Sequence, residues 1–219
     1  MSANTDRKPM STRSLRTRHS LVEAGLQLFS ERPVDAVPID DIVATAGVSK
    51  GSFFNHFEDK QKFADSISAD IRMDLEARIT NVNEGVSDPL TRIIGGMRVA
   101  ADFALREKQR TIIMTRGSSL PTGRDHPLNA GLRSDMEAAS EAGLLREEAR
   151  SAGILFWLGA CHWVMANIVD KSLSRAEAAI RLRNMMVMSL IGLGVDEVQA
   201  QQLAADSETW LLTNTVAKT

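Results

Sequence analysis

Small polar side chains and two phenylalanines alternate in a short segment in the first third of the chain. Lys50, Ser52 and Asn55 carry hydrogen-bond donors and acceptors of the kind that bind phosphates and base edges. Phe53 and Phe57 lie about one helical turn apart, so a helix would direct both rings to the same side. This pattern is typical of a helix that turns its polar side to the major groove of duplex DNA. The alternative is a polar surface helix, and the spacing alone does not separate the two.

Two short helices joined by a glycine turn are expected to position this segment. Asp40 and Asp41 fit the first turn of one helix, where the positive end of the helix dipole favours carboxylates. Gly47 follows where the chain must turn, and Ser49 is suited to cap a second helix of about nine residues that ends near Phe57. The pair predicts a helix-turn-helix.

Longer helices are expected on both sides of this motif. The first spans about 12–30 and contains Gly25, which predicts a close contact with another helix. Asp59 is suited to cap the next helix. That helix is expected to connect the motif to the rest of the chain. Its apolar residues recur every four positions on one side: Phe63, Ile67, Ile71 and Leu75.

The run from Ile42 to Lys60, IVATAGVSKGSFFNHFEDK, resembles the signature of the tetracycline-repressor (TetR) family. The resemblance covers about 13–65. It implies an all-α fold of about nine or ten helices, with a three-helix DNA-binding domain over 1–62 and a larger effector-binding and dimerisation domain over 63–219. It also implies a homodimer formed by two helices of each chain, 147–170 and 174–191. The matching residues are Ile42, Ala46, Gly47, Val48, Ser49, Gly51, His56, Phe57 and Lys60.

By this resemblance, a set of polar residues and glycine would face DNA, and a basic N-terminal arm would reach the backbone or the minor groove. The arm, 1–18, has five basic residues against one acidic residue, although a solvated tail is the alternative. Phe54 departs from the family, which usually has a tyrosine whose hydroxyl binds phosphate. The implied DNA-binding residues are Lys50, Gly51, Ser52, Asn55, His56, Lys60, Arg13 and Arg16, and the other arm cations are Arg7, Lys8 and Arg18.

The chain after Gly85 is expected to form the second helical domain. Asp88 and the proline after it open one helix, 116–127 has the composition of a loop, and the last helix spans about 196–213. Large flexible and aromatic side chains would line a pocket for a small hydrophobic effector, although each fits a core or dimer interface equally well. These candidates are Met97, Phe103, Met114, Phe156, Trp157, Met165 and Met186.

Composition narrows the remaining function classes. The one cysteine, Cys161, excludes an internal disulfide and is expected to be an inert thiol, and His162 is expected to be a buried, satisfied histidine. The four histidines are scattered and no catalytic motif is present, so we expect no metal, no cofactor and no enzyme activity. We expect no apolar run to approach the roughly 20 residues that span a bilayer, which favours a cytoplasmic protein without a membrane partner.

Two functions remain. The first is a sequence-specific transcriptional regulator, a repressor that a small hydrophobic effector releases from a palindromic operator in double-stranded DNA. The second is a module for small-molecule binding or protein interaction whose head has lost operator recognition, for which Phe54 is the only hint. Activation rather than repression depends on where the operator lies, which the sequence does not decide.

Overall fold

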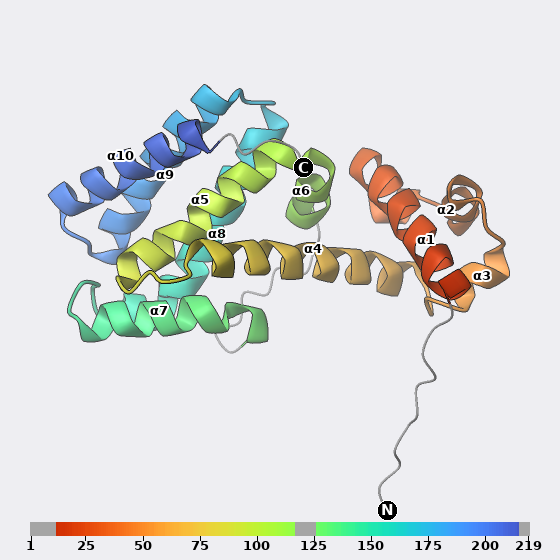
Figure 1. Ribbon diagram of the computed structural model, residues 1–219, viewed down its shortest axis with the longest axis horizontal. Coiled ribbons are helices and arrows are strands. Elements are labelled where there is room, and N and C mark those ends of the chain that lie inside the picture. Colours follow the sequence, from red (N-terminus) through yellow and green to blue (C-terminus); the bar gives the residue numbers. More distant parts are fainter. Residues whose placement is uncertain (1–11, 117–125, 215–219) are drawn as a thin grey trace, which may run out of the picture. The chain divides into compact units, whose positions relative to one another are not determined.

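The computed structural model describes residues 12–116 and 126–214, and these residues form ten α-helices and two short 3-10 helices without a β-strand (Figure 1). The predicted all-α fold is therefore confirmed. The chain divides into two units, one ending at Ala69 and the other beginning at Asp70. This division falls inside one long helix, α4 (Lys60–Val82), rather than after residue 62 as the sequence predicts.

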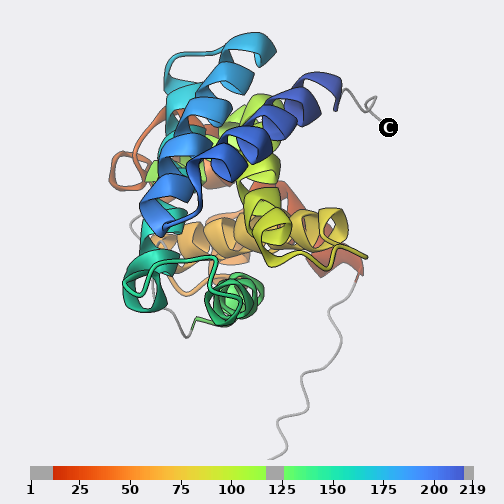
Figure 2. The ribbon, with the colours of Figure 1, turned by 90° about the vertical axis from the view of Figure 1, so that its left-hand side faces the viewer.

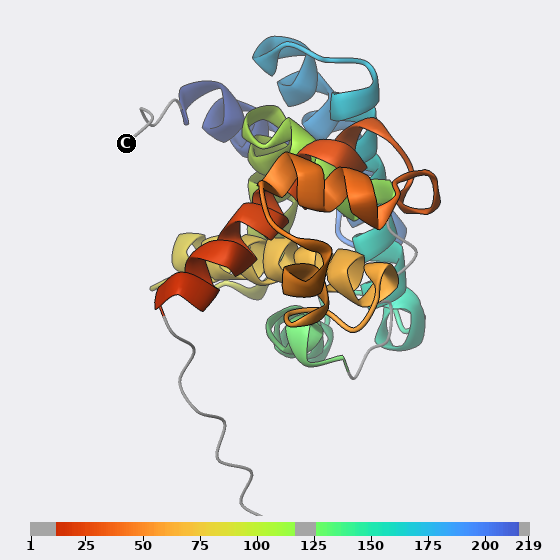
Figure 3. The ribbon, with the colours of Figure 1, turned by 90° about the vertical axis from the view of Figure 1, so that its right-hand side faces the viewer.

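Three helices and the first turns of α4 make up the N-terminal unit, which we call the head (Figure 3). Helix α1 spans Thr12–Glu31, α2 spans Ile39–Ala46 and α3 spans Lys50–Phe54. A 3-10 turn, η1 (Val34–Ala36), connects α1 to α2. The first two helices agree with the sequence prediction.

Four phenylalanine rings form the centre of the head. Phe53 and Phe63 are fully buried, and Phe29 and Phe57 are at most 7% exposed. The ring centroids of Phe57 and Phe63 lie 4.6 Å apart, and those of Phe53 and Phe63 lie 5.4 Å apart. Aromatic pairs at these separations add to the stabilisation from burial. Phe53 of α3 and Phe57, three residues after the end of this helix, therefore point inward, and the polar side of α3 is left outside.

The turn before α3 is built by the residues that the sequence indicates. Gly47 has φ +65°, a left-handed conformation that favours glycine. The Ser49 hydroxyl accepts a hydrogen bond from the Ser52 N–H at 3.2 Å, which caps α3. However, α3 ends at Phe54, so the prediction of nine helical residues was wrong. The His56 N–H donates to the Phe53 carbonyl three residues back, and this tighter bond turns the chain out of the helix.

Gly25 lies where α1 meets α4, as its place inside a helix predicts. A Cβ at this position would lie 2.5 Å from Cδ1 of Ile67 and 2.6 Å from the ring of Phe63. We expect Gly25→Ala to lower the free energy of unfolding by about 1–3 kcal/mol, because overpacking outweighs the better helix propensity of alanine. Urea unfolding followed by circular dichroism measures this change. Gly131→Ala is the control, because nothing lies within 4 Å of a Cβ there, and equal destabilisation of both variants would contradict the prediction.

The C-terminal unit consists of the remaining turns of α4 and six further helices. Helix α8 packs against four of them, α5, α6, α7 and α9. In Figure 2, α9 and α10 lie side by side, in agreement with their packing. The bounds are α5 Pro89–Arg106, α6 Lys108–Arg116, α7 Ala130–Glu141, α8 Ala149–Asp170, α9 Arg175–Leu193 and α10 Glu197–Thr213, with the 3-10 turn η2 at Pro127–Asn129.

Capping residues begin and end these helices largely where the sequence indicates. Asp88 accepts the Thr91 N–H at 2.7 Å, and Ser174 with Glu177 forms a capping box at the start of α9. Helix α9 continues to Leu193, past the predicted end, and stops at Gly194, which has φ +100°. Most of the predicted loop 116–127 lies outside the described residues.

Helix α8 is long and apolar enough to cross a membrane by length and composition alone. It has 22 residues, and its most apolar 18-residue window has a mean hydropathy of 1.6. Within the structure, 44% of this window is buried. The expectation that no apolar segment approaches this length was therefore wrong. A helix packed in the middle of a helical domain passes the same test, because both its inner and outer sides are apolar.

Candidate DNA-binding face and ligand cavity

The side of α3 opposite the phenylalanine core is open to solvent. Lys50, Gly51 and Asn55 are exposed, and Ser52 and His56 are half-buried. Helix α3 therefore has the two-sided character that groove binding requires, with an apolar anchor and a polar outer side. We call the surface formed by these five residues and Phe54, which is 50% exposed, the α3 face.

Two polar side chains of the α3 face interact with neighbours in the head. The Lys50 Nζ lies 2.9 Å from Asp40 Oδ1, and both side chains are more than half exposed. The hydroxyls of Ser49 and Ser52 lie 2.9 Å apart. An exposed ion pair contributes little to stability, so Asp40 leaves the Lys50 ammonium available to other anions.

Lys60 has a structural contact that the sequence did not indicate. Its ammonium donates hydrogen bonds to the carbonyls of Asp35 and Val37 at 3.1 and 3.0 Å. These bonds tie the start of α4 to the loop before α2, so Lys60 helps to position the helix-turn-helix. An ammonium has three donors, and a phosphate contact by Lys60 stays a prediction.

The described part of the basic arm belongs to α1. Arg13 and Arg16 are exposed on its first turns. Arg18 lies closer to the core, with its guanidinium carbon 5.8 Å from the centre of the Phe57 ring. Arg7 and Lys8 lie outside the described residues. Contacts of Arg13 and Arg16 with DNA stay a prediction.

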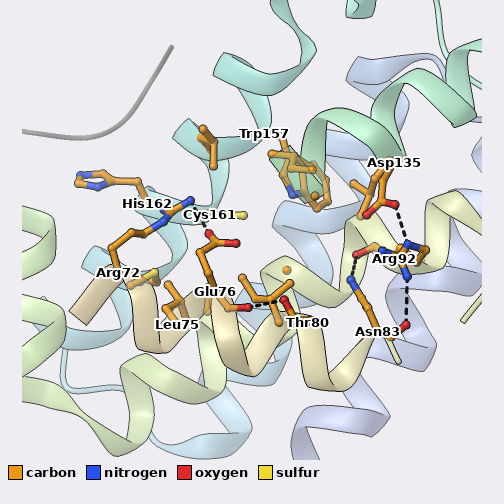
Figure 4. A pocket seen from close by; sticks show the side chains of 18 of the residues that line it. Arg72, Leu75, Glu76, Thr80, Asn83, Arg92, Asp135, Trp157, Cys161 and His162 are labelled. Carbon is orange, nitrogen blue, oxygen red and sulfur yellow. Dashed lines mark hydrogen bonds and ion pairs between the residues drawn. The ribbon is translucent and has the colours of Figure 1, made fainter. Parts of the chain in front are cut away.

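The C-terminal unit contains a cavity of about 120 Å³ (Figure 4). Its walls come from the later turns of α4 and from α5, α6, α7 and α8. Two ion pairs border it: Arg72 with Glu76 on α4, and Arg92 on α5 with Asp135 on α7, each with an N–O distance of 2.6 Å. The remaining wall is largely apolar, formed by Leu75, Ile79, Ile93, Ala100, Leu132 and Leu158 among others.

Three of the seven predicted effector residues line this cavity: Met114, Trp157 and Met165. The other four do not. Met97 and Met186 are fully buried in the core, and Met186 accepts a hydrogen bond from the Ser207 hydroxyl at 3.0 Å. Phe103 is also buried, with the guanidinium groups of Arg78 and Arg110 within 5.4 Å of its ring centre. Phe156 is 45% exposed on the outer side of α8.

The polar residues of the cavity were missed by sequence reasoning. Asn83 is 5% exposed and donates to the Arg92 carbonyl, while the Arg92 guanidinium donates to the Asn83 carbonyl. These bonds fix the junction between α4 and α5 beside the cavity. The sequence offers one weak signal, since Arg72 and Glu76 have the spacing of a helical ion pair. That spacing is equally common on solvated surfaces.

His162 lies on the cavity wall and is only half-buried, with its ring 5.6 Å from that of Trp163. Desolvation lowers the pKa of His162, so the ring is neutral near pH 7. Among the described residues, none forms a hydrogen bond with it, so the expectation of a buried, satisfied histidine was wrong.

Cys161 also lines the cavity, where desolvation raises the pKa of its thiol to about 12. We expect iodoacetamide at pH 8 to alkylate the native protein about three orders of magnitude more slowly than an ordinary thiol, because the thiolate is the nucleophile. Mass spectrometry over time measures this rate. Unfolding in urea should restore the ordinary rate, and rapid alkylation of the native chain would contradict the inert-thiol prediction.

An exposed apolar strip follows α8 and α9. On α8, Leu155 and Trp163 are 56% and 67% exposed. On α9, Ile180 and Met188 are 54% and 71% exposed. Phe156 lies over Gly192, where a Cβ would be 3.0 Å from its ring. We call these residues the α8–α9 strip, because they extend along both helices.

Residues 21–67 match the family described as "Bacterial regulatory proteins, tetR family". This match covers the helix-turn-helix whose geometry is given above. Residues 21–67 are therefore a DNA-binding domain of the TetR family. The HTH-type transcriptional repressor DhaR of Mycobacterium sp. (strain GP1) is 41% identical to this chain over 75 residues. That similarity covers 34% of this chain and 38% of DhaR.

Solved structures show the same fold over most of this chain. A putative tetR family transcription regulator from Shewanella sp. PV-4 superposes with a TM-score of 0.69, covering 81% of this chain and 97% of that one at 16% identity. AibR in complex with isovaleryl coenzyme A and operator DNA superposes with a TM-score of 0.54 at 18% identity. The superposition covers 71% of this chain and 95% of AibR. At such identities the likeness concerns the fold alone.

Proposed function

We propose that this TetR-family protein is a dimeric transcriptional repressor that binds an operator through α3 and leaves it when a small molecule occupies the cavity. The observation that carries the proposal is the two-sided packing of α3. Phe53 and Phe57 are buried while Lys50 and Asn55 face solvent. The repressor name of DhaR supports the same direction of regulation.

The α8–α9 strip supports the homodimer. Apolar side chains that are about half to two-thirds exposed along two adjacent helices are costly in water, and a second copy of the chain would cover them. A twofold dimer presents two α3 helices to two half-sites, which requires a palindromic operator. The partner subunit would thus cover the apolar outer side of α8, which fits a protein in the cytoplasm, where DNA lies.

Helix α4 supports the coupling of ligand and DNA. It begins in the head at Lys60, and its later residues Arg72, Glu76 and Ile79 line the cavity. A ligand that binds one placement of α4 more tightly than another shifts the population of that placement. AibR, which was crystallised with an acyl coenzyme A and operator DNA, is a precedent for such a pair of partners on this fold.

A selection of bound duplexes from a random pool tests the proposal. We expect an inverted repeat to be enriched. The affinity of the protein for this repeat should fall steeply as the salt concentration rises, because basic side chains replace counterions on the phosphates. The second candidate, a binding module without operator recognition, is favoured by the apolar Phe54 on the α3 face. Recovery of no preferred sequence would favour that candidate and contradict the repressor.

A further inference from the structure

The cavity wall carries an indole N–H that forms no hydrogen bond with the residues that the structure describes. Trp157 is 1% exposed, and no acceptor for its Nε1 exists among the described residues. Gly96 faces this nitrogen, since a Cβ on that residue would lie 4.0 Å from Nε1. The absence of a side chain at Gly96 therefore leaves space beside the N–H. Buried donors are nearly always paired, so this one is suited to a ligand oxygen.

An acceptor lies on another wall of the same cavity. The Glu76 carboxylate has Arg72 as its partner within the described part of the chain, at 2.6 Å. An ionised carboxylate accepts about four hydrogen bonds, so Glu76 has acceptor capacity left. Figure 4 shows Glu76 and Trp157 extending from different helices toward the same space. The cavity thus offers both a donor and an acceptor to a ligand.

The charges of the cavity cancel. Arg72 is paired with Glu76, and Arg92 is paired with Asp135, which leaves no net charge for an ionic ligand to neutralise. The rest of the wall is largely apolar. Burial of an unpaired charge costs much more than burial of a hydrogen-bonded neutral group, so an uncharged ligand is favoured.

The size of the cavity limits the ligand. Its volume is about 120 Å³. A protein cavity of about 150 Å³ binds benzene, so this cavity accommodates about one six-membered ring or a chain of similar volume. A larger ligand requires the walls to move.

We infer that the cavity takes a small uncharged alcohol or phenol, whose hydroxyl accepts from Trp157 and donates to Glu76 while its ring or chain packs on the apolar wall. This inference rests on the proposed effector role of the cavity. It narrows the general class of small hydrophobic effectors to hydroxylated compounds of about one ring.

Calorimetric titration of the full-length protein without DNA tests the inference with four probes of similar size. These are cyclohexanol, cyclohexanone, methylcyclohexane and cyclohexanecarboxylate. We expect the alcohol to bind tightest and the carboxylate weakest. The variant Trp157→Phe should weaken cyclohexanol at least tenfold and methylcyclohexane by less than threefold. Trp210→Phe on α10, outside the cavity, is the matched control and should change neither.

A second variant keeps the test decisive if Trp157→Phe folds poorly. Gly96→Ala places a methyl beside Nε1 without a steric clash and should weaken all four probes. Equal binding of methylcyclohexane and cyclohexanol, or tightest binding of the carboxylate, would overturn the inference. If operator binding is found but no probe binds, the ligand class is wrong and the repressor stands. If cyclohexanol binds without releasing operator, the effector role is wrong and the ligand class stands.

Discussion

The double variant Lys50→Ala/Asn55→Ala should lose at least about 30-fold in operator affinity while keeping its fold. Each well-formed base contact contributes about 1–3 kcal/mol of discrimination. The loss of two contacts therefore costs at least about 2 kcal/mol of binding free energy, which corresponds to about 30-fold in affinity. Both side chains are exposed, and the only described partner of Lys50 is the exposed Asp40. The melting temperature should therefore change little. Gel shifts or fluorescence anisotropy with the selected operator measure the affinity.

Asp40→Ala is the matched control for this variant. It breaks the same 2.9 Å ion pair but leaves Lys50 in place. Its operator affinity should be equal to that of the wild type or higher, because Lys50 no longer has an intramolecular competitor for phosphate. If the double variant binds the operator as the wild type does, the α3 face is not the surface that contacts DNA.

Trp163→Glu should convert the dimer into a 24.0 kDa monomer and lower operator affinity by about 100-fold or more. Trp163 is the most exposed residue of α8 in the α8–α9 strip, so the change scarcely affects the core of its own chain. In a twofold interface, the substitution places a carboxylate on both sides of the apolar contact. The monomer then contacts one half-site and loses the affinity that comes from binding both half-sites at once. Light scattering after size exclusion measures the mass.

Val198→Glu on α10 is the control for this experiment. Val198 is 78% exposed but lies outside the α8–α9 strip, so the same charge there should leave the dimer intact. If Trp163→Glu remains dimeric, the strip is not the dimer interface. Monomers of both variants would instead indicate that any added charge disrupts the assembly.

The head was predictable because its determinants are local. The spacing of Phe53 and Phe57 alone indicates which side of the segment 50–57 faces the core, and Gly47 marks a turn that needs a left-handed residue. The length of α3 was not predictable, because its end depends on one hydrogen bond from His56 to Phe53. The contact of Lys60 with Asp35 and Val37 joins parts of the head that periodicity does not relate.

The cavity was only partly predictable because it depends on packing between distant segments. Arg92 and Asp135 are 43 positions apart, and no local pattern pairs them. Apolar size alone selected Met114 and Trp157, which line the cavity, but it also selected Met186, which fills the core. Whether an apolar helical residue faces a cavity, a core or a partner is decided by the helices around it.

Phe54 has a consequence for the chemistry of the operator itself. In the proposed complex, the polar side chains of the α3 face would distinguish bases by donors and acceptors, whereas this half-exposed ring offers only an apolar surface. In the major groove the matching apolar group is the 5-methyl of thymine. A pyrimidine methyl opposite Phe54 would then contribute to recognition, and replacement of that thymine by uracil would weaken the complex without removing a hydrogen bond. Methylation of a cytosine at the same position would present an equivalent methyl group, so this head would respond to the methylation state of its DNA.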